Sequence, residues 1–231
     1  MNINYSLVDK ILKTLFPLPE DFGAKDDFEE SYDSFCYNDI LSKIEKADPE
    51  ANVSYGATKL VIYSPSLGDV VIKIPFNGVY DEEDYFIPFC HAHAEDASDY
   101  CLSEYEKYRT LFLHGLDCFL ARTILYAVWD NTRIFLQEFV REINCTDLQK
   151  IRHSSAKSKE LVKSLIGDKR CPFNRDWLAQ CIDTYGYSKV IDFLAYCENV
   201  DKDILQDMHG GNYGYRSNGT PAILDYCGYY D

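Results

Sequence analysis

The sequence predicts a fold that mixes α-helices and β-strands, and three observations predict it. Extended, β-rich runs occupy residues 53–75 and residues 122–140. A helical pattern near residues 99–112 separates these runs, and two further helical patterns follow at 175–185 and 188–199. Together these patterns indicate one chain that contains both strands and helices.

The composition indicates a folded, acidic protein. With 46% hydrophobic residues in a chain of 231, there is ample material for a core. The net charge of −15 disfavours nucleic acids and anionic membranes as partners, because both bind basic surfaces. No apolar run is long enough to span a bilayer, and no basic-then-apolar leader opens the chain. Nine cysteines without a C-x-x-C pair are interpreted as reduced thiols in a cytoplasm.

Residues 1–50 are expected to form a helical extension that packs on the rest of the chain. One helix should span residues 2–16 and end at the following prolines, with a buried face of Val8, Ile11, Leu12 and Leu15. A second, shorter helix should be capped by Asn38 or Asp39 and continue through Ile44.

Two residues stand out in the first β-rich run. Gly56, in the segment S-Y-G-A-T-K-L-V, would let backbone N–H groups approach phosphate oxygens, although any hairpin can hold a glycine. Lys73 lies inside the apolar strand V-V-I-K-I, where a buried ammonium group is costly unless it is paired. The alternative for Lys73 is an edge strand with a solvated lysine.

The next stretch offers a partner for that lysine. Residues 76–99 are rich in acidic and aromatic residues and include a C-H-A-H tetrad, but without a second ligand pair at zinc spacing a surface loop is expected. The helix that follows carries Glu104, with Glu106 as its rival; a solvated-face acid is the alternative for both. The predicted buried face of this helix is Leu102, Tyr105, Tyr108, Leu111 and Phe112.

Further on, a predicted hairpin turns at Asp130-Asn131, and its second strand ends in Q-E-F-V at residues 137–140. Residues 145–170 are locally basic, which suits either an acidic partner or, as expected here, the solvated faces of helices. The helical patterns 175–185 and 188–199 are separated by Gly186.

The C-terminal stretch holds the strongest motif, D-x-H-x-x-N from Asp207 to Asn212. A hairpin with a two-residue turn at Asn218-Gly219 should bring Asn212 and Asp225 to one end. A few oxygen ligands of this kind suit Mg²⁺ completed by phosphates and water. An Asp that accepts a hydroxyl proton, beside an Asn and an Asp on a metal, is the arrangement of phosphoryl transfer. The alternative is a Gly-rich polar turn before a hairpin.

Taken in order, these motifs resemble those of the protein-kinase-like superfamily over residues 52–231. The motif D-M-H-x-G-N resembles the corresponding motif of phage-encoded protein kinases that shut off host functions. The resemblance implies a two-lobed α+β fold, with an antiparallel-sheet N-lobe at 51–141, into which 76–99 is inserted, and a truncated, mainly helical C-lobe at 142–231. L-Q-D stands where the family has H-R-D, and the sequence ends soon after Asp225 without an activation segment, as in truncated bacterial effector kinases.

The same resemblance implies ATP and Mg²⁺ as cofactors. Lys73, steadied by Glu104, would hold the phosphates, and Gly56 would lie behind them. Gln137 would be the gatekeeper of the adenine pocket, and the backbone groups of Glu138 and Val140 would bond the adenine edge.

In the catalytic loop, Asp207 would orient and deprotonate the acceptor hydroxyl, while Asn212 and Asp225 would hold Mg²⁺. His209 would contact the γ-phosphate or hold the loop by a hydrogen bond; a purely structural histidine is the alternative.

The implied activity is that of a serine/threonine protein kinase acting on a host or partner protein, in a cytoplasm that is the host's if the protein is phage- or effector-encoded. Two other functions stay open. One is an inactive pseudokinase that serves as a protein-binding module, and the other is a kinase of small molecules, which usually needs a larger C-lobe.

Overall fold

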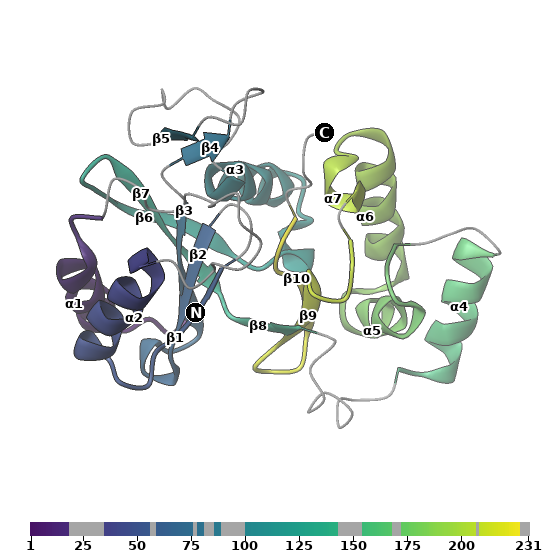
Figure 1. The fold of residues 1–231 in the computed structure, drawn as a ribbon. Coiled ribbons are helices and arrows are strands. Elements are labelled where there is room, and N and C mark those ends of the chain that lie inside the picture. Colours follow the sequence, from purple (N-terminus) through teal and green to yellow (C-terminus); the bar gives the residue numbers. More distant parts are fainter. Residues whose placement is uncertain are drawn as a thin grey trace. The chain divides into compact units, whose positions relative to one another are not determined.

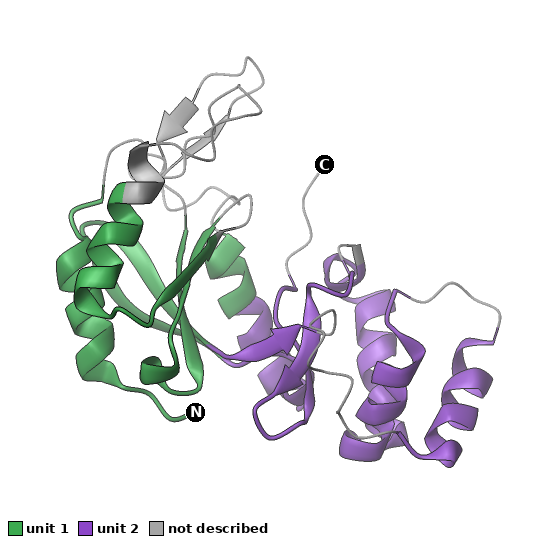
Figure 2. Cartoon of the chain, turned by 60° about the horizontal axis from the view of Figure 1, so that its bottom comes forward, with its two compact units in different colours: residues 1–105, 123–137 green, residues 106–122, 138–231 purple. Residues whose placement is uncertain are grey.

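The computed structural model describes residues 1–18, 35–55, 59–75, 78–80, 86–88, 100–142, 154–167, 172–206 and 208–226. The fold is α+β, as predicted, and the chain divides into two compact units (Figure 2). Unit 1 comprises residues 1–105 and 123–137, and unit 2 comprises residues 106–122 and 138–231. These divisions differ from the expected boundaries at residues 50 and 141, because the N-terminal helices belong to unit 1 and the 106–122 segment belongs to unit 2.

Unit 1 is built on a five-stranded sheet with the strand order β1-β2-β3-β7-β6 (Figure 1). The pairs β1–β2, β2–β3 and β6–β7 are antiparallel. A separate two-stranded sheet joins β4 and β5. The elements assigned to this unit, with α3 and the last residue of β7 continuing into unit 2, are α1 (Tyr5–Leu15), α2 (Phe35–Ala47), β1 (Asn52–Tyr55), β2 (Lys59–Tyr63), η1 (Pro65–Leu67), β3 (Val70–Pro75), β4 (Gly78–Tyr80), β5 (Phe86–Pro88), α3 (Tyr100–Leu113), β6 (Thr123–Trp129) and β7 (Thr132–Glu138).

Side-chain alternation gives the sheet of unit 1 two different faces. Successive residues of a strand point to opposite sides, and one side forms an apolar core with helices α1 and α2. That core takes its strand residues from every second position: Leu60, Ile62, Val70, Ile72, Ile74, Ile134 and Leu136. The residues between them, Lys73 and Phe135 among them, therefore point to the other side, where α3 lies: Tyr105 of α3 packs on Phe135 with ring centroids 6.1 Å apart.

Helix α1 confirms the apolar spacing read from the sequence. Val8, Ile11, Leu12 and Leu15 are all fully buried in the core of unit 1, and the Asn4 side chain caps the helix by accepting from the N–H of Leu7. Helix α2 begins at Phe35, earlier than predicted, so neither Asn38 nor Asp39 is its N-cap. Asp39 instead pairs with Lys43 at 3.1 Å, a contact between neighbours four residues apart on the surface of the helix.

The β6–β7 hairpin has the predicted turn at Asp130-Asn131. Both residues have positive φ, 47° and 60°, and Trp129 pairs with Thr132 across the turn. Two consecutive left-handed residues define a type I′ turn, whose twist matches that of the strands it joins.

Unit 2 packs helices against a three-stranded sheet of order β10-β9-β8, in which both strand pairs are antiparallel. Its remaining elements are η2 (Asp117–Phe119), β8 (Val140–Glu142), α4 (Ala156–Ile166), α5 (Arg175–Tyr185), α6 (Tyr187–Asn199), α7 (Asp203–Gln206), β9 (Tyr213–Arg216) and β10 (Pro221–Ile223). Helices α5 and α6 lie where the sequence predicted them, to within one residue. The core is aromatic: Trp177 of α5 donates from Nε1 to the carbonyl of Gly214 at 3.0 Å and packs on Tyr213.

The β9–β10 hairpin forms as predicted, but its turn differs. The loop contains three residues, 217–219, because the N–H of Arg216 donates to the Thr220 carbonyl at 2.9 Å and the N–H of Gly219 donates to the Arg216 carbonyl at 2.8 Å. Gly219 has a φ of 82°, which a glycine adopts without strain. The two-residue turn read from Asn218-Gly219 is therefore wrong, and the glycine serves a longer loop of a common kind.

Gly214 allows β8 and β9 to approach each other. A Cβ added there would lie 1.8 Å from the carbonyl oxygen of Arg141, a backbone atom that cannot rotate away. We expect Gly214→Ala to lower the free energy of unfolding by about 3 kcal/mol, measured by urea denaturation. Gly115→Ala is the control, because Gly115 has a φ of 67° but open space around it. It should cost only about 1 kcal/mol, and equal losses for both variants would contradict the clash.

Within the described ranges, no helix combines the length and apolar character needed to cross a bilayer. Cys118, Cys181 and Cys197 are free thiols, and of these Cys181 and Cys197 are buried.

Candidate functional site

Lys73 lies in the middle of β3 with 2% of its surface exposed. Its neighbours Ile72 and Ile74 point into the core of unit 1, so alternation turns Lys73 to the opposite face, toward α3. The Lys73 ammonium donates to Glu104 Oε2 at 2.7 Å. The edge-strand alternative is thereby excluded, because the lysine is buried and paired on a strand that has neighbours on both sides.

Glu104 of α3 is the acid that the lysine contacts. Its surface is fully buried, whereas Glu106, the rival considered from the sequence, is exposed. The predicted apolar face of α3 is wrong at its end, since Phe112 is 61% exposed. The buried residues of this helix instead include Cys101, Glu104 and Leu111. One of them is an acid, and a hydrophobicity pattern would assign an acid to the exposed face.

Lys59 is a second lysine on the same carboxylate, and the sequence motifs did not reveal it. It is 7% exposed, and its ammonium donates to Glu104 Oε1 at 2.8 Å. The register pairs Lys59 with Pro75 and Val61 with Lys73, so the two lysines are diagonal neighbours on one face of the sheet. The signal was present in K-L-V-I-Y, where inward Leu60 and Ile62 imply that Lys59 points the other way.

Gln137, the predicted gatekeeper, is buried in unit 1. Its Nε2 donates to Thr123 Oγ1 at 3.0 Å and to Glu104 Oε2 at 3.3 Å. The amide thus links the strand pair β6–β7 to the acid of α3. Its side chain holds the Glu104 carboxylate in place on the same side of the sheet as the two lysines.

Glu138 and Val140, the predicted adenine contacts, belong to unit 2. The N–H of Glu138 donates to the Arg122 carbonyl at 2.8 Å, so this donor serves the protein backbone and not a ligand. The predicted contact between the backbone of Glu138 and the adenine edge can therefore involve only the Glu138 carbonyl. Val140 begins β8, where it pairs with Arg216 of β9.

Asn212 and Asp225, the predicted magnesium ligands, come together at the open end of the β9–β10 hairpin. The Asn212 carbonyl accepts from the N–H of Leu224 at 2.8 Å and from the N–H of Asp225 at 3.2 Å. This follows from the register of the hairpin. Tyr213 and Ile223 form its last pair, Asn212 precedes Tyr213, and Leu224 and Asp225 follow Ile223. One amide and one carboxylate fit the oxygen donors that Mg²⁺ takes when phosphates and water complete its shell.

His209 holds the loop that leads into this pair. Its Nδ1 accepts from the N–H of Gly211 at 3.0 Å, and its carbonyl accepts from the N–H of Asn212 at 2.9 Å. A Cβ at Gly211 would lie 2.9 Å from the imidazole ring, so the loop closes tightly on the histidine. This bond to a backbone N–H fits both the loop-holding role and the structural alternative, a histidine bonded to backbone.

Three predictions lie outside the described residues. They are the roles of Gly56 and Asp207 and the surface loop around the C-H-A-H tetrad at 90–93. Among the residues that the structure does describe, no group of three or more His, Cys, Asp or Glu side chains is arranged to hold a metal ion.

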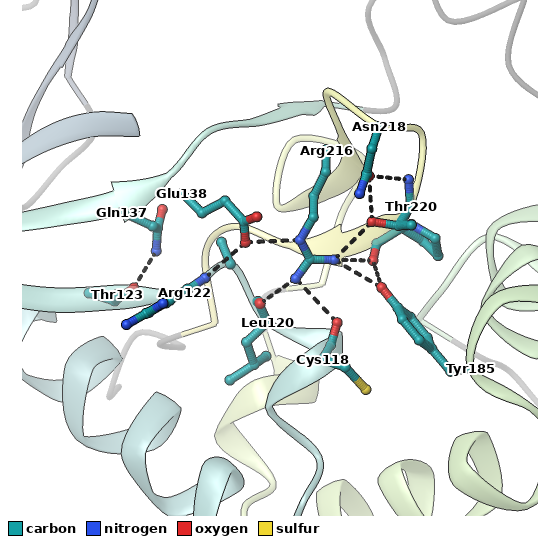
Figure 3. A network of polar contacts seen from close by, with 12 residues as sticks. Cys118, Leu120, Arg122, Thr123, Gln137, Glu138, Tyr185, Arg216, Asn218 and Thr220 are labelled. Atoms are coloured by element: carbon teal, nitrogen blue, oxygen red, sulfur yellow. Dashed lines mark hydrogen bonds and ion pairs between the residues drawn. The ribbon is translucent and has the colours of Figure 1, made fainter. Parts of the chain in front are cut away.

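Arg216 organises unit 2 around the hairpin, a role that no sequence motif indicated (Figure 3). Its Nε donates to Glu138 Oε2 at 2.9 Å. Its terminal nitrogens donate to four oxygens in three further segments at 2.8 to 3.2 Å: the Tyr185 hydroxyl and the carbonyls of Pro221, Leu120 and Cys118. One planar guanidinium thereby joins β9, β10, η2, α5 and the end of β7.

Electrostatics in this network keep the arginine charged. Burial alone would lower the pKa of Arg216, but the Tyr185 and Glu138 side chains outweigh it, and the pKa is raised above its usual value. Burial raises the pKa of Tyr185 to about 12, against the opposing effect of Arg216. Tyr185 therefore stays a neutral phenol at physiological pH, and the Glu138 carboxylate supplies the countercharge.

Comparison with known proteins assigns no family to this arrangement. No protein-family model matches the sequence, and no curated protein matches it. The function is therefore inferred from the side chains described above.

Proposed function

We propose that this protein is an ATP- and Mg²⁺-dependent phosphotransferase of protein-kinase-like, two-lobed fold that acts on serine or threonine hydroxyls of a protein. The observation that carries the proposal is the buried ion pair between Lys73 of β3 and Glu104 of α3, with 2.7 Å between Nζ and Oε2. In the family that the sequence resembles, a strand lysine held by a helix glutamate positions the phosphates of ATP.

The burial of this pair supports a functional role more than a structural one. Removing two charges from water costs several kcal/mol per ion, and apolar residues of similar volume often stabilise a core as well or better. The same strand, β3, buries apolar side chains on its other face, at Ile72 and Ile74. An ammonium fixed by a carboxylate is preorganised to meet a phosphate oxygen.

The hairpin supplies the proposed metal ligands. Asn212 and Asp225 would hold Mg²⁺, which neutralises charge on the transferred phosphoryl group. Asp207, five residues before Asn212, would accept the proton of the acceptor hydroxyl. His209, already bonded to Gly211, would keep the loop between these residues in shape.

The proposed substrate is a protein, and the proposed setting is a cytoplasm. The net charge of −15 favours neither nucleic acid nor an anionic membrane as partner. The thiols of Cys118, Cys181 and Cys197 are free, which suits a reducing compartment.

A transfer assay tests this function. The protein is incubated with ATP labelled in the γ-phosphate, Mg²⁺ and a cell lysate, and label transferred to protein is measured. We expect Asp207→Asn and Asp225→Asn each to reduce the rate by about 10³-fold, because one loses the proton acceptor and the other a metal ligand. Asp192→Asn, at an exposed acid of α6, is the matched control and should transfer at the wild-type rate.

Absence of transfer by the wild type, or equal transfer by Asp207→Asn, would defeat the catalytic proposal. Nucleotide binding without transfer would instead indicate a pseudokinase that serves as a binding module.

A further inference from the structure

The loop between β9 and β10 contains an Asn-Gly pair, Asn218-Gly219, which the proposed function does not use. Asparagine is among the thermally labile residues. It is most labile before glycine, because no side chain hinders attack by the following backbone nitrogen. Asn218 is exposed, and Gly219 has a φ of 82°. The pair therefore combines a solvent-exposed amide with the least hindered backbone nitrogen that a chain can offer.

Deamidation at such a pair needs only water. The Gly219 nitrogen loses its proton and attacks Asn218 Cγ, the bond from Cγ to Nδ2 breaks, and ammonia leaves, so that a cyclic succinimide forms. Water then opens the ring. Opening at the side-chain carbonyl gives aspartate, and opening at the backbone carbonyl gives isoaspartate, in which the main chain runs through Cβ and Cγ. No group is oxidised or reduced in either step.

The native loop holds the attacking nitrogen. The Gly219 N–H donates to the Arg216 carbonyl at 2.8 Å, and the Arg216 N–H donates to the Thr220 carbonyl at 2.9 Å, so that these two bonds close the loop. The Gly219 nitrogen can lose its proton and approach Cγ only after it leaves the Arg216 carbonyl. Local opening of the loop must therefore precede the reaction.

The reacting side chain is held as well, and Figure 3 shows it directed toward Thr220. Asn218 Oδ1 accepts from the Thr220 N–H at 3.0 Å and from Thr220 Oγ1 at 2.8 Å. The other side of the loop is anchored by the guanidinium of Arg216, whose Nη1 lies 3.5 Å from Thr220 Oγ1 and 2.8 Å from the Pro221 carbonyl. The amide is thus fixed by a residue that the buried arginine keeps in place.

We infer that Asn218 is a site of spontaneous deamidation, and that the native hairpin delays the reaction by holding both reacting groups. The inference does not depend on the proposed function. Isoaspartate adds one atom to the main chain of a short loop, so the two bonds that join Arg216 to Gly219 and Thr220 could not both keep their present geometry. The modification would thereby loosen the β9–β10 turn where Arg216 anchors it.

Incubation of the folded and the unfolded chain tests the inference. Wild-type protein is kept at mildly alkaline pH, in buffer and in guanidinium chloride, and aspartate and isoaspartate at position 218 are quantified over time by peptide mass spectrometry. We expect conversion in both, about tenfold slower in the folded protein, because the bonds that hold the loop must break first. Asn218→Gln confirms the assignment: glutamine would have to form a larger ring, so position 218 should give no product.

Two other asparagines calibrate the rates. Asn77 also precedes a glycine, Gly78, so in guanidinium chloride it should react within about twofold of Asn218. Asn131 is exposed in the β6–β7 turn but precedes Thr132, whose branched side chain hinders the attack. In the folded protein Asn131 should therefore react more slowly than Asn218.

The outcomes separate the two parts of the inference. If Asn218 of the folded protein reacts no faster than Asn131, Asn218 is not a deamidation site. If the folded and the unfolded chain convert Asn218 at the same rate, the hairpin does not delay the reaction. Slow conversion in buffer, faster conversion in guanidinium chloride and the expected order of the two asparagines would support both parts.

Discussion

Replacing Glu104 by glutamine is expected to lower the free energy of unfolding by about 3 to 5 kcal/mol. The substitution keeps the volume of the side chain but removes the charge that Lys59 and Lys73 both contact, at 2.8 and 2.7 Å. Breaking a buried ion pair from one side is far more destabilising than removing both partners, because the remaining charge stays buried. Urea denaturation followed by circular dichroism measures the change.

Glu106→Gln is the control for this experiment. Glu106 lies on the same helix, two residues away, and is exposed, so its substitution should change stability by no more than about 0.5 kcal/mol. If Glu104→Gln is as stable as Glu106→Gln, the two lysines do not depend on the carboxylate. The rise in melting temperature on adding ATP is a second readout. We expect Glu104→Gln to lose this rise and Glu106→Gln to keep it, since phosphate binding would lose its preorganised lysines only in the first variant.

The second large effect is expected at Arg216. Arg216→Met should lower the free energy of unfolding by about 4 kcal/mol, because it removes the countercharge of Glu138 and the donors for the buried carbonyls of Leu120 and Pro221. Methionine keeps most of the apolar stem, so the loss reports on the guanidinium. Arg216→Lys should recover less than half of it, since one ammonium cannot reproduce a planar fork with five donors.

Arg175→Met provides the comparison for Arg216. Arg175 is exposed at the start of α5 and donates a hydrogen bond to the Gly167 carbonyl at 3.0 Å. It should change stability by about 0.5 kcal/mol or less. Full rescue of stability by Arg216→Lys would mean that charge, and not the fork of donors, holds these segments together.

Local patterns in the sequence predicted those parts of the fold that depend on nearby residues. The buried face of α1 follows from apolar spacing, and the β6–β7 turn follows from two residues, Asp130 and Asn131, that tolerate positive φ. The convergence of Asn212 with Asp225 follows from a hairpin register. Each of these features needs only the period of a helix or the geometry of one turn.

What could not be predicted depends on residues far apart in the chain. The contacts of Arg216 come from residues 118–120, 138, 185 and 221, and no local pattern indicates that they meet. Lys59 reaches Glu104 across 45 residues, and the face it occupies follows only once the β2–β3 register is known. The buried face of α3 was predicted wrongly at Phe112, because that face includes Glu104, and hydrophobicity alone assigns an acid to solvent.

The shared carboxylate of unit 1 couples one helix to two strands at a single buried point. Lys59 of β2 and Lys73 of β3 both contact Glu104 of α3, one on each carboxylate oxygen. A displacement of α3 that carried Glu104 away would therefore change the surroundings of both ammonium groups at once.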